Sequence, residues 1–239
     1  MNRTPLRTTL TLGLLAPLWT SSALAGIDPP FQVEAVAQAN GSQTGNFYFD
    51  ADSAPNAALT PVTASGSIVD VSSSASATFT EFAAFSQNNL SSNSNAQSFG
   101  RANDTLTIFP AGNPVGTTRL EMTWQVEGTL SGSGNQQAAL LSAYRTDTAG
   151  DGNPNIFLPG TFYTTNGPVS DSVTLSYDNV PLGSPWNVRT TFSTSVSNGP
   201  GEADFASTAT FVGATLFVNN VPTTAAVTGL RGQVYAVPE

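Results

Sequence analysis

Acidic and amide side chains gather in the glycine-rich segment 147–155, which is the first candidate for chemistry. Asp147, Asp151, Asn153 and Asn155 follow one another at spacings of two or four residues. Calcium takes six to eight oxygen ligands, and a flexible loop with such spacings can bring carboxylate and amide oxygens to one point. The segment is not an EF-hand, because no glutamate closes it. A surface turn would have the same composition, since Gly, Asn and Asp favour tight turns. A calcium site and a plain turn are therefore the two alternatives, and calcium is the only cofactor candidate.

Two pairs of carboxylates stand two residues apart: Asp50 with Asp52, and Glu202 with Asp204. In an extended strand both members of such a pair point to one face. Their separation is then close to the roughly 5–9.5 Å between the two carboxyl groups of a glycosidase. Solvated carboxylates on the strands of an acidic protein give the same pattern. We therefore expect no catalytic residues, and keep a glycan-active enzyme as the alternative.

Aromatic side chains could stack on sugar rings, and Trp186 is the main candidate because it lies in the turn segment 183–187. Tyr144, Tyr163 and Tyr177 are further candidates. A buried aromatic that closes the end of a β-sandwich is the alternative for Trp186.

The missing residue types exclude many functions. The chain has no histidine, cysteine or lysine, and seven arginines stand against 16 acidic residues, with a formal net charge of −9. Without histidine or cysteine there is no Ser-His-Asp triad, no cysteine nucleophile and no ordinary zinc site, and without lysine there is no Schiff base. A surface of this sign repels phosphate backbones, so we expect no nucleic-acid partner.

Strands must position these residues. Leu120, Met122, Trp124 and Val126 alternate with polar residues across residues 118–129, which predicts a half-buried strand. The same signal is weaker at residues 173–177 and 188–196. Further strands are expected at residues 31–39, 46–49, 66–82, 105–109, 137–145, 161–165, 206–218 and 232–237.

Gly, Pro, Asn and Ser clusters separate these segments and indicate turns. Short strands at this spacing predict an all-β fold, an antiparallel β-sandwich or jelly-roll-like single domain over residues 26–236. The segment 86–103 is rich in Ser, Asn and Gln, which predicts a long mobile loop or a boundary between two sheets.

The N-terminus has the order of a secretory signal. Arg3 and Arg7 precede an apolar stretch at residues 10–19, and Ala23 and Ala25 form an A-x-A cleavage site. We expect residues 1–25 to be removed and the mature protein to begin at Gly26. The apolar stretch is shorter than the roughly 20 residues of a membrane-spanning helix. No second such stretch follows, so we expect no transmembrane segment after cleavage.

The C-terminal residues 204–218 and 227–239 resemble the C-terminal portion of PEP-CTERM proteins. Val237, Pro238 and Glu239 match the start of the Val-Pro-Glu-Pro sorting motif of that family. In the family a transmembrane helix and an arginine cluster follow the motif, and a membrane exosortase processes these proteins in bacteria that make biofilms and exopolysaccharides. The second proline, the helix and the basic cluster are absent here. The alternatives are a chain trimmed at the signal, a member released without sorting, and a chance match of three residues.

The resemblance and the composition together predict a non-enzymatic exported protein of the cell surface or extracellular matrix, at the outer surface of a Gram-negative-type bacterium. Adhesion or association with extracellular polysaccharide is the expected role. Exosortase is the expected partner if the sorting signal is complete in the native chain. The alternative is a calcium-dependent carbohydrate-binding module or a glycan-active enzyme that uses carboxylates.

Overall fold

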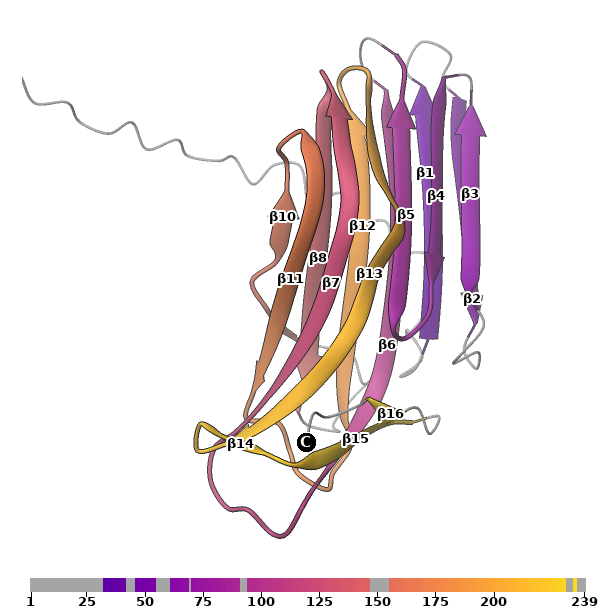
Figure 1. Ribbon diagram of the computed structural model, residues 1–239. Coiled ribbons are helices and arrows are strands. Elements are labelled where there is room, and N and C mark those ends of the chain that lie inside the picture. The colour runs from indigo at the N-terminus through magenta and orange to yellow at the C-terminus, as the bar shows by residue number, and fades with distance from the viewer. Residues whose placement is uncertain are drawn as a thin grey trace, which may run out of the picture.

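The chain folds into two antiparallel β-sheets packed face to face (Figure 1). The structure is a computed structural model that describes residues 32–41, 46–54, 61–68, 70–90, 94–146, 155–230 and 234–235. Within these ranges every regular element is a strand and no helix occurs. The all-β fold class is therefore confirmed, and the architecture is a β-sandwich.

Sheet A has nine strands, and its main path is β10-β8-β12-β6-β1-β2. Three short strands pair off this path, with β9 on β8, β15 on β6, and β16 on β15. The bounds of the strands of sheet A are β1 (Gln32–Gly41), β2 (Asn46–Ala54), β6 (Asn95–Pro110), β8 (Asn135–Arg145), β9 (Ile156–Phe157), β10 (Thr161–Tyr163), β12 (Trp186–Ser197), β15 (Ala225–Gly229) and β16 (Val234–Tyr235).

Sheet B has seven strands in the order β11-β7-β13-β5-β4-β3, with β14 paired to β13. Its strands are β3 (Val62–Ile68), β4 (Val71–Ala77), β5 (Glu81–Asn88), β7 (Thr118–Gly132), β11 (Gly167–Asp178), β13 (Gly201–Val218) and β14 (Val221–Thr223).

The core fills the space between the sheets, and β7 shows how the sequence specifies it. Leu120, Met122, Trp124 and Val126 are buried, and the residues between them face solvent from the outer side of sheet B. Because side chains alternate along a strand, the period-two pattern places every apolar residue of β7 in one core. Burial of each large apolar side chain stabilises the fold by about 1.5–3 kcal/mol. The strand predicted at residues 118–129 is confirmed.

Of the two alternatives for residues 86–103, the long mobile loop is wrong and the boundary between two sheets is confirmed, because the chain passes here from β5 in sheet B to β6 in sheet A. Residues 95–103, half of this segment, belong to β6, which lies between β12 and β1 in sheet A. Ser98 of β6 is buried and hydrogen-bonded. Thr194 Oγ1 lies 2.9 Å from both Ser86 Oγ and Ser98 Oγ, and Ser98 Oγ donates to the carbonyl oxygen of Phe85 at 3.0 Å. Hydroxyls paired in this way cost little to bury, so a polar segment can contribute to a central strand.

The single strand expected at residues 66–82 is also wrong, because the chain turns twice there. Ile68 pairs with Val71, so two residues reverse the chain between β3 and β4. Asp70 in this turn has a φ of 62°, a left-handed conformation that Asp tolerates better than most residues. A second turn then leads into β5.

Candidate functional site

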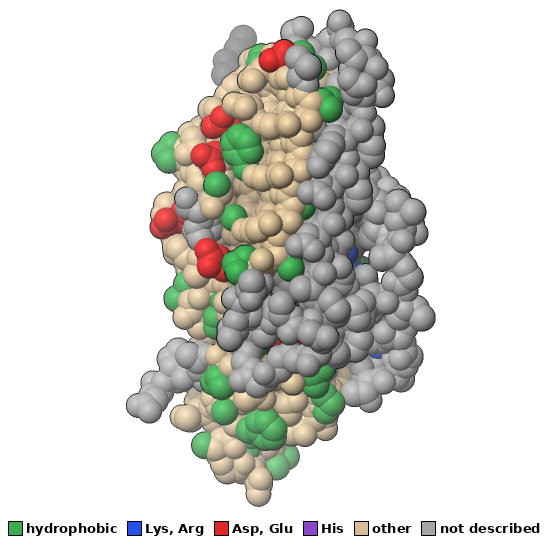
Figure 2. All heavy atoms as spheres, turned by 90° about the vertical axis from the view of Figure 1, so that its right-hand side faces the viewer, with side chains coloured by type: hydrophobic (Ala, Val, Ile, Leu, Met, Phe, Trp, Pro, Cys, Tyr) green, Lys and Arg blue, Asp and Glu red, His purple; other side chains and the backbone are tan. Residues whose placement is uncertain are grey.

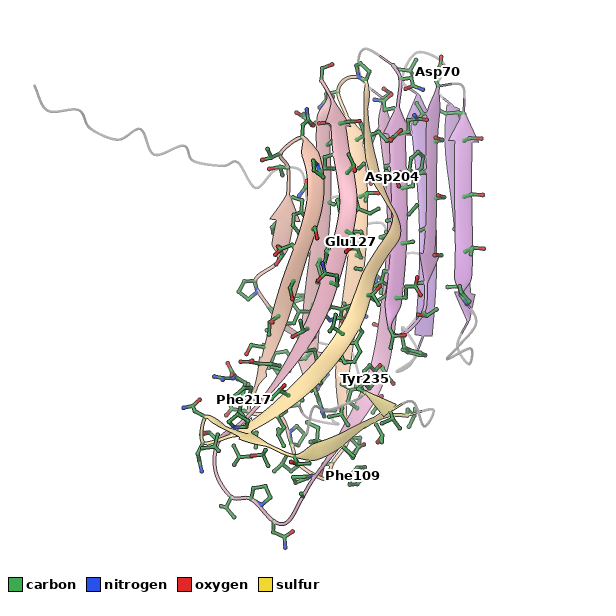
Figure 3. All side chains as sticks on the ribbon, viewed as in Figure 1. Asp70, Phe109, Glu127, Asp204, Phe217 and Tyr235 are labelled. Atoms are coloured by element: carbon green, nitrogen blue, oxygen red, sulfur yellow. The ribbon has the colours of Figure 1, made fainter. Side chains whose placement is uncertain are left out.

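An open hollow of about 480 Å³ lies on sheet B, where β7, β11 and β13 run side by side. Its lining residues are Glu127, Gly128, Thr129, Val169, Ser170 and Asp204. Figure 3 labels Glu127 on β7 and Asp204 on β13. The hollow therefore combines two carboxylates and two hydroxyls with an apolar side chain.

An irregularity in β13 shapes this hollow. Asp204 pairs with Thr129, but the next β13 residue that pairs with β7 is Ala209, opposite Val126. More residues of β13 than of β7 lie between these two pairs, so β13 bulges. Gly128 lies against the bulge, and a Cβ atom there would come 2.3 Å from Cδ1 of Phe205. Only glycine fits under this ring.

The two carboxylates of the hollow come from different strands. Glu127 is exposed, whereas Asp204 is partly buried and its Oδ1 accepts a hydrogen bond from the Ala206 amide at 3.0 Å. Glu202, the predicted partner of Asp204, is not among the lining residues, and its Oε2 accepts from Nε2 of Gln87 at 2.9 Å. The structure thus brings Asp204 together with Glu127. The side chains of the other predicted pair, Asp50 and Asp52, lie outside what the structure describes.

The lining determines which ligands the hollow suits. Carboxylates accept hydrogen bonds, and the hydroxyls of Thr129 and Ser170 both donate and accept. No arginine and no aromatic residue is among the lining residues. In a chain with a net charge of −9, such a site favours a neutral, hydroxyl-rich molecule or a cation over an anion.

The predicted calcium loop lies largely outside the described residues. Asp147, Asp151 and Asn153 are not described. Asn155 is exposed, and its backbone amide donates to the carbonyl oxygen of Tyr144 at 3.1 Å. Among the residues that the structure describes, no group of three or more acidic side chains is close enough to hold a metal ion.

Trp186 is a core residue, which corrects its assignment to sugar stacking. Its side chain is 0% exposed and packs against Tyr144 and Tyr177, with ring centroids 6.1 Å and 5.5 Å away. The Tyr177 hydroxyl lies 2.9 Å from Ser142 Oγ, and burial raises the pKa of Tyr177 to about 12. The alternative of a buried aromatic at the end of the sandwich therefore holds for Trp186, and Tyr144 and Tyr177 lie in the same cluster.

Tyr163, the remaining aromatic candidate, lies on β10 of sheet A and contacts two residues of sheet B. Its hydroxyl donates to Oδ2 of Asp171 on β11 at 3.1 Å, and its ring stacks on Phe205 at 6.3 Å between centroids. Desolvation, followed by the hydrogen bond to Asp171, raises the pKa of Tyr163. One face of this ring is already covered by Phe205.

A second polar centre, which sequence reasoning missed, is buried at the other end of the sandwich. Oδ2 of Asp104 accepts from the Tyr235 hydroxyl at 2.7 Å, and its Oδ1 accepts from the amides of Thr105 at 2.7 Å and Leu230 at 3.3 Å. Desolvation by burial raises the pKa of Asp104, although these three hydrogen bonds oppose the rise. The carboxyl ties β15 and β16 to β6.

Two comparisons with known proteins add no relative. No protein-family model matches the chain, and no curated protein sequence matches it. The described residues include no helix long and apolar enough to cross a membrane. Val237, Pro238 and Glu239, which carry the resemblance to the sorting motif, lie outside the described residues. Fold and site together define an acidic β-sandwich protein with an open polar hollow on one sheet.

Proposed function

We propose that this chain is a non-enzymatic exported protein of the bacterial cell surface or extracellular matrix, and that it associates with extracellular polysaccharide through the hollow on sheet B. The hollow carries the proposal, because it is open, lined by hydrogen-bonding groups and large enough for sugar units. A role in adhesion follows from the same surface. Export through the signal at residues 1–25 and sorting by an exosortase belong to the same proposal, supported by the sequence features of the two ends.

The second candidate is a calcium-dependent carbohydrate-binding module or a glycan-active enzyme. The observation that favours it is the presence of Glu127 and Asp204 in one hollow. Two carboxylates can act as acid and base, or as oxygen ligands of a cation. The lining includes no aromatic residue, so a sugar bound here would be held by hydrogen bonds to its hydroxyl groups rather than by stacking.

The test is retention of the mature protein, residues 26–239, on neutral and acidic polysaccharides. The hollow variant is Glu127→Gln/Asp204→Asn, which removes two charges and keeps the side-chain shapes. The amide oxygen that Asp204→Asn introduces can still accept the hydrogen bond from the Ala206 amide. We therefore expect an unchanged melting temperature and at least tenfold weaker retention.

The matched control is Glu81→Gln/Asp178→Asn, which removes the same charge from two exposed residues outside the hollow. We expect this control to bind like the wild-type protein. Equal loss in both variants would mean that overall charge, not the hollow, governs binding. No loss in the hollow variant would refute the proposed site.

The same protein samples test the second candidate function. Release of reducing ends by the wild-type protein, absent in the hollow variant, would establish an enzyme. Retention that requires calcium and is abolished by Asp151→Ala would establish the calcium-dependent module with its site at the predicted loop.

A further inference from the structure

The two sheets of the sandwich differ in charge. The strand sequences of sheet A have four acidic residues and three arginines, whereas the strands of sheet B carry seven acidic residues and one arginine, Arg119, which forms an ion pair with Glu121 at 3.1 Å. The acidic residues of sheet B are Glu81, Glu121, Glu127, Asp171, Asp178, Glu202 and Asp204. Figure 2 views the sandwich from the side of β3, and acidic side chains lie along its left margin, the face that sheet B turns to the viewer in Figure 1. A face of one sign concentrates ligands of the opposite sign, so sheet B attracts cations.

Three of these carboxylates form a line that starts in the hollow. Glu127 lies on β7, Asp204 pairs with Thr129, and Glu202 pairs with Ser131. Along β7 they therefore stand at positions 127, 129 and 131, which are roughly 6.6 Å apart at about 3.3 Å per residue. Figure 3 shows Glu127 and then Asp204 on the way from the middle of the sandwich to its upper end. The line runs along the strands and leads out of the hollow.

The spacing of this line suits separate cationic groups better than one metal ion. Calcium lies roughly 2.3–2.6 Å from its oxygens, so two oxygens on one ion are within roughly 5 Å of each other. Among the described residues no three acidic side chains are close enough to share an ion. The spacing instead allows one positive group beside each carboxylate.

The protein groups that hold these carboxylates leave their charge in place. The backbone amide of Ala206 donates to Asp204 at 3.0 Å, and Nε2 of Gln87 donates to Glu202 at 2.9 Å. Both donors are neutral. The arginine of sheet B lies eight residues, roughly 26 Å, from Glu127 along β7. A ligand that brings its own positive charges is therefore favoured at this line.

We propose that the polysaccharide bound at the hollow is one whose sugars carry free amino groups, and that their ammonium groups pair with Glu127, Asp204 and Glu202. This inference rests on the proposed function of the hollow. The hydroxyls of Thr129 and Ser170 in the lining can exchange hydrogen bonds with sugar hydroxyls. An acidic polysaccharide is repelled by the line, and a neutral one gains nothing from its charge. A lysine-rich peptide has the charge but lacks the ring hydroxyls.

The test is calorimetric titration of the mature protein, residues 26–239, with the hexasaccharides of glucosamine and of N-acetylglucosamine. Acetylation removes the positive charge and keeps the ring and its linkage, so this pair of ligands isolates the ammonium group. We expect the glucosamine hexamer to bind about tenfold tighter at low salt. The difference should disappear at about 1 M salt, where the screening length falls to about 3 Å.

Three variants locate the preference. Glu127→Gln/Asp204→Asn should reduce it to about twofold or less, and Glu202→Gln should reduce it by about half. The matched control, Glu81→Gln/Asp178→Asn, removes two charges from sheet B outside the line and should keep the full preference. Melting temperatures show whether each variant is folded.

The failure of the substrate class and the failure of the proposed function give different results. Equal affinity for the two hexamers, or an equal loss of preference in the control, would overturn the amino-sugar class. Hexalysine that binds as tightly as the glucosamine hexamer, and loses as much in Glu127→Gln/Asp204→Asn, would mean that the site recognises charge alone and would also overturn it. No retention on any polysaccharide, amino-sugar polymers included, would refute the proposed function itself.

Discussion

Removal of the Tyr235 hydroxyl is the sharpest test of the buried hydrogen bonds at Asp104, which hold β15 and β16 on β6. In Tyr235→Phe the ring keeps its edge-to-face contact with Phe211, at 5.2 Å between centroids and 90° between planes. The lost interaction is the 2.7 Å hydrogen bond to Oδ2 of Asp104, which is itself 4% exposed. A buried carboxylate oxygen then lacks a donor, and such bonds to charged groups contribute about 1.5–3 kcal/mol.

We expect Tyr235→Phe to lower the free energy of unfolding by about 2 kcal/mol at pH 7, and the melting temperature by about 4–8 °C for a domain of this size. Urea unfolding followed by tryptophan fluorescence measures the loss. A double-mutant cycle with Asp104→Ala, which removes the acceptor, isolates the pairwise contribution, for which we expect about 1–2 kcal/mol. Equal losses with and without Asp104 would show that the hydroxyl acts elsewhere.

The pH dependence gives an independent check. Because burial raises the pKa of Asp104 above its ordinary value of 3.8, the folded state holds this proton more tightly than the unfolded state. The stability that protonation contributes is complete below pH 3.8 and is lost as the pH rises through the raised pKa. The wild-type protein should therefore gain stability relative to Asp104→Asn on acidification from pH 7. A relative loss would mean that the hydrogen bonds outweigh desolvation and the pKa is lowered.

Two further changes test the core and the hollow. Trp186→Ala should lower the free energy of unfolding by about 3–5 kcal/mol, because it empties a fully buried site beside Tyr144 and Tyr177. Urea unfolding measures this loss, and a value below about 1 kcal/mol would mean that the ring is not packed there. Gly128→Ala should cost about 1–3 kcal/mol because its methyl group meets the Phe205 ring, whereas Thr129→Ala, next along β7, should cost under about 0.5 kcal/mol. Equal stability of these two variants would contradict the tight contact at the bulge.

The elements that could be predicted from the sequence are those whose pattern is local. The alternation around Trp124 depends only on which face of one strand is buried, so it identified β7 correctly. The position of Ser98 in a buried strand could not be predicted, because its burial depends on Ser86 and Thr194, which lie on other strands. A polar strand and a polar loop can have the same composition, and only the partners in space distinguish them.

The site could not be predicted for a related reason. Asp204 and Glu127 line one hollow because β13 bulges where it pairs with β7. The sequence around each residue contains no pattern that predicts this register shift. The hydrogen bond between Tyr235 and Asp104 joins residues 131 positions apart. Trp186 lies next to a turn, and the sequence of that turn is compatible with an exposed or a buried side chain. Its burial depends on Tyr144 and Tyr177, which come from other strands.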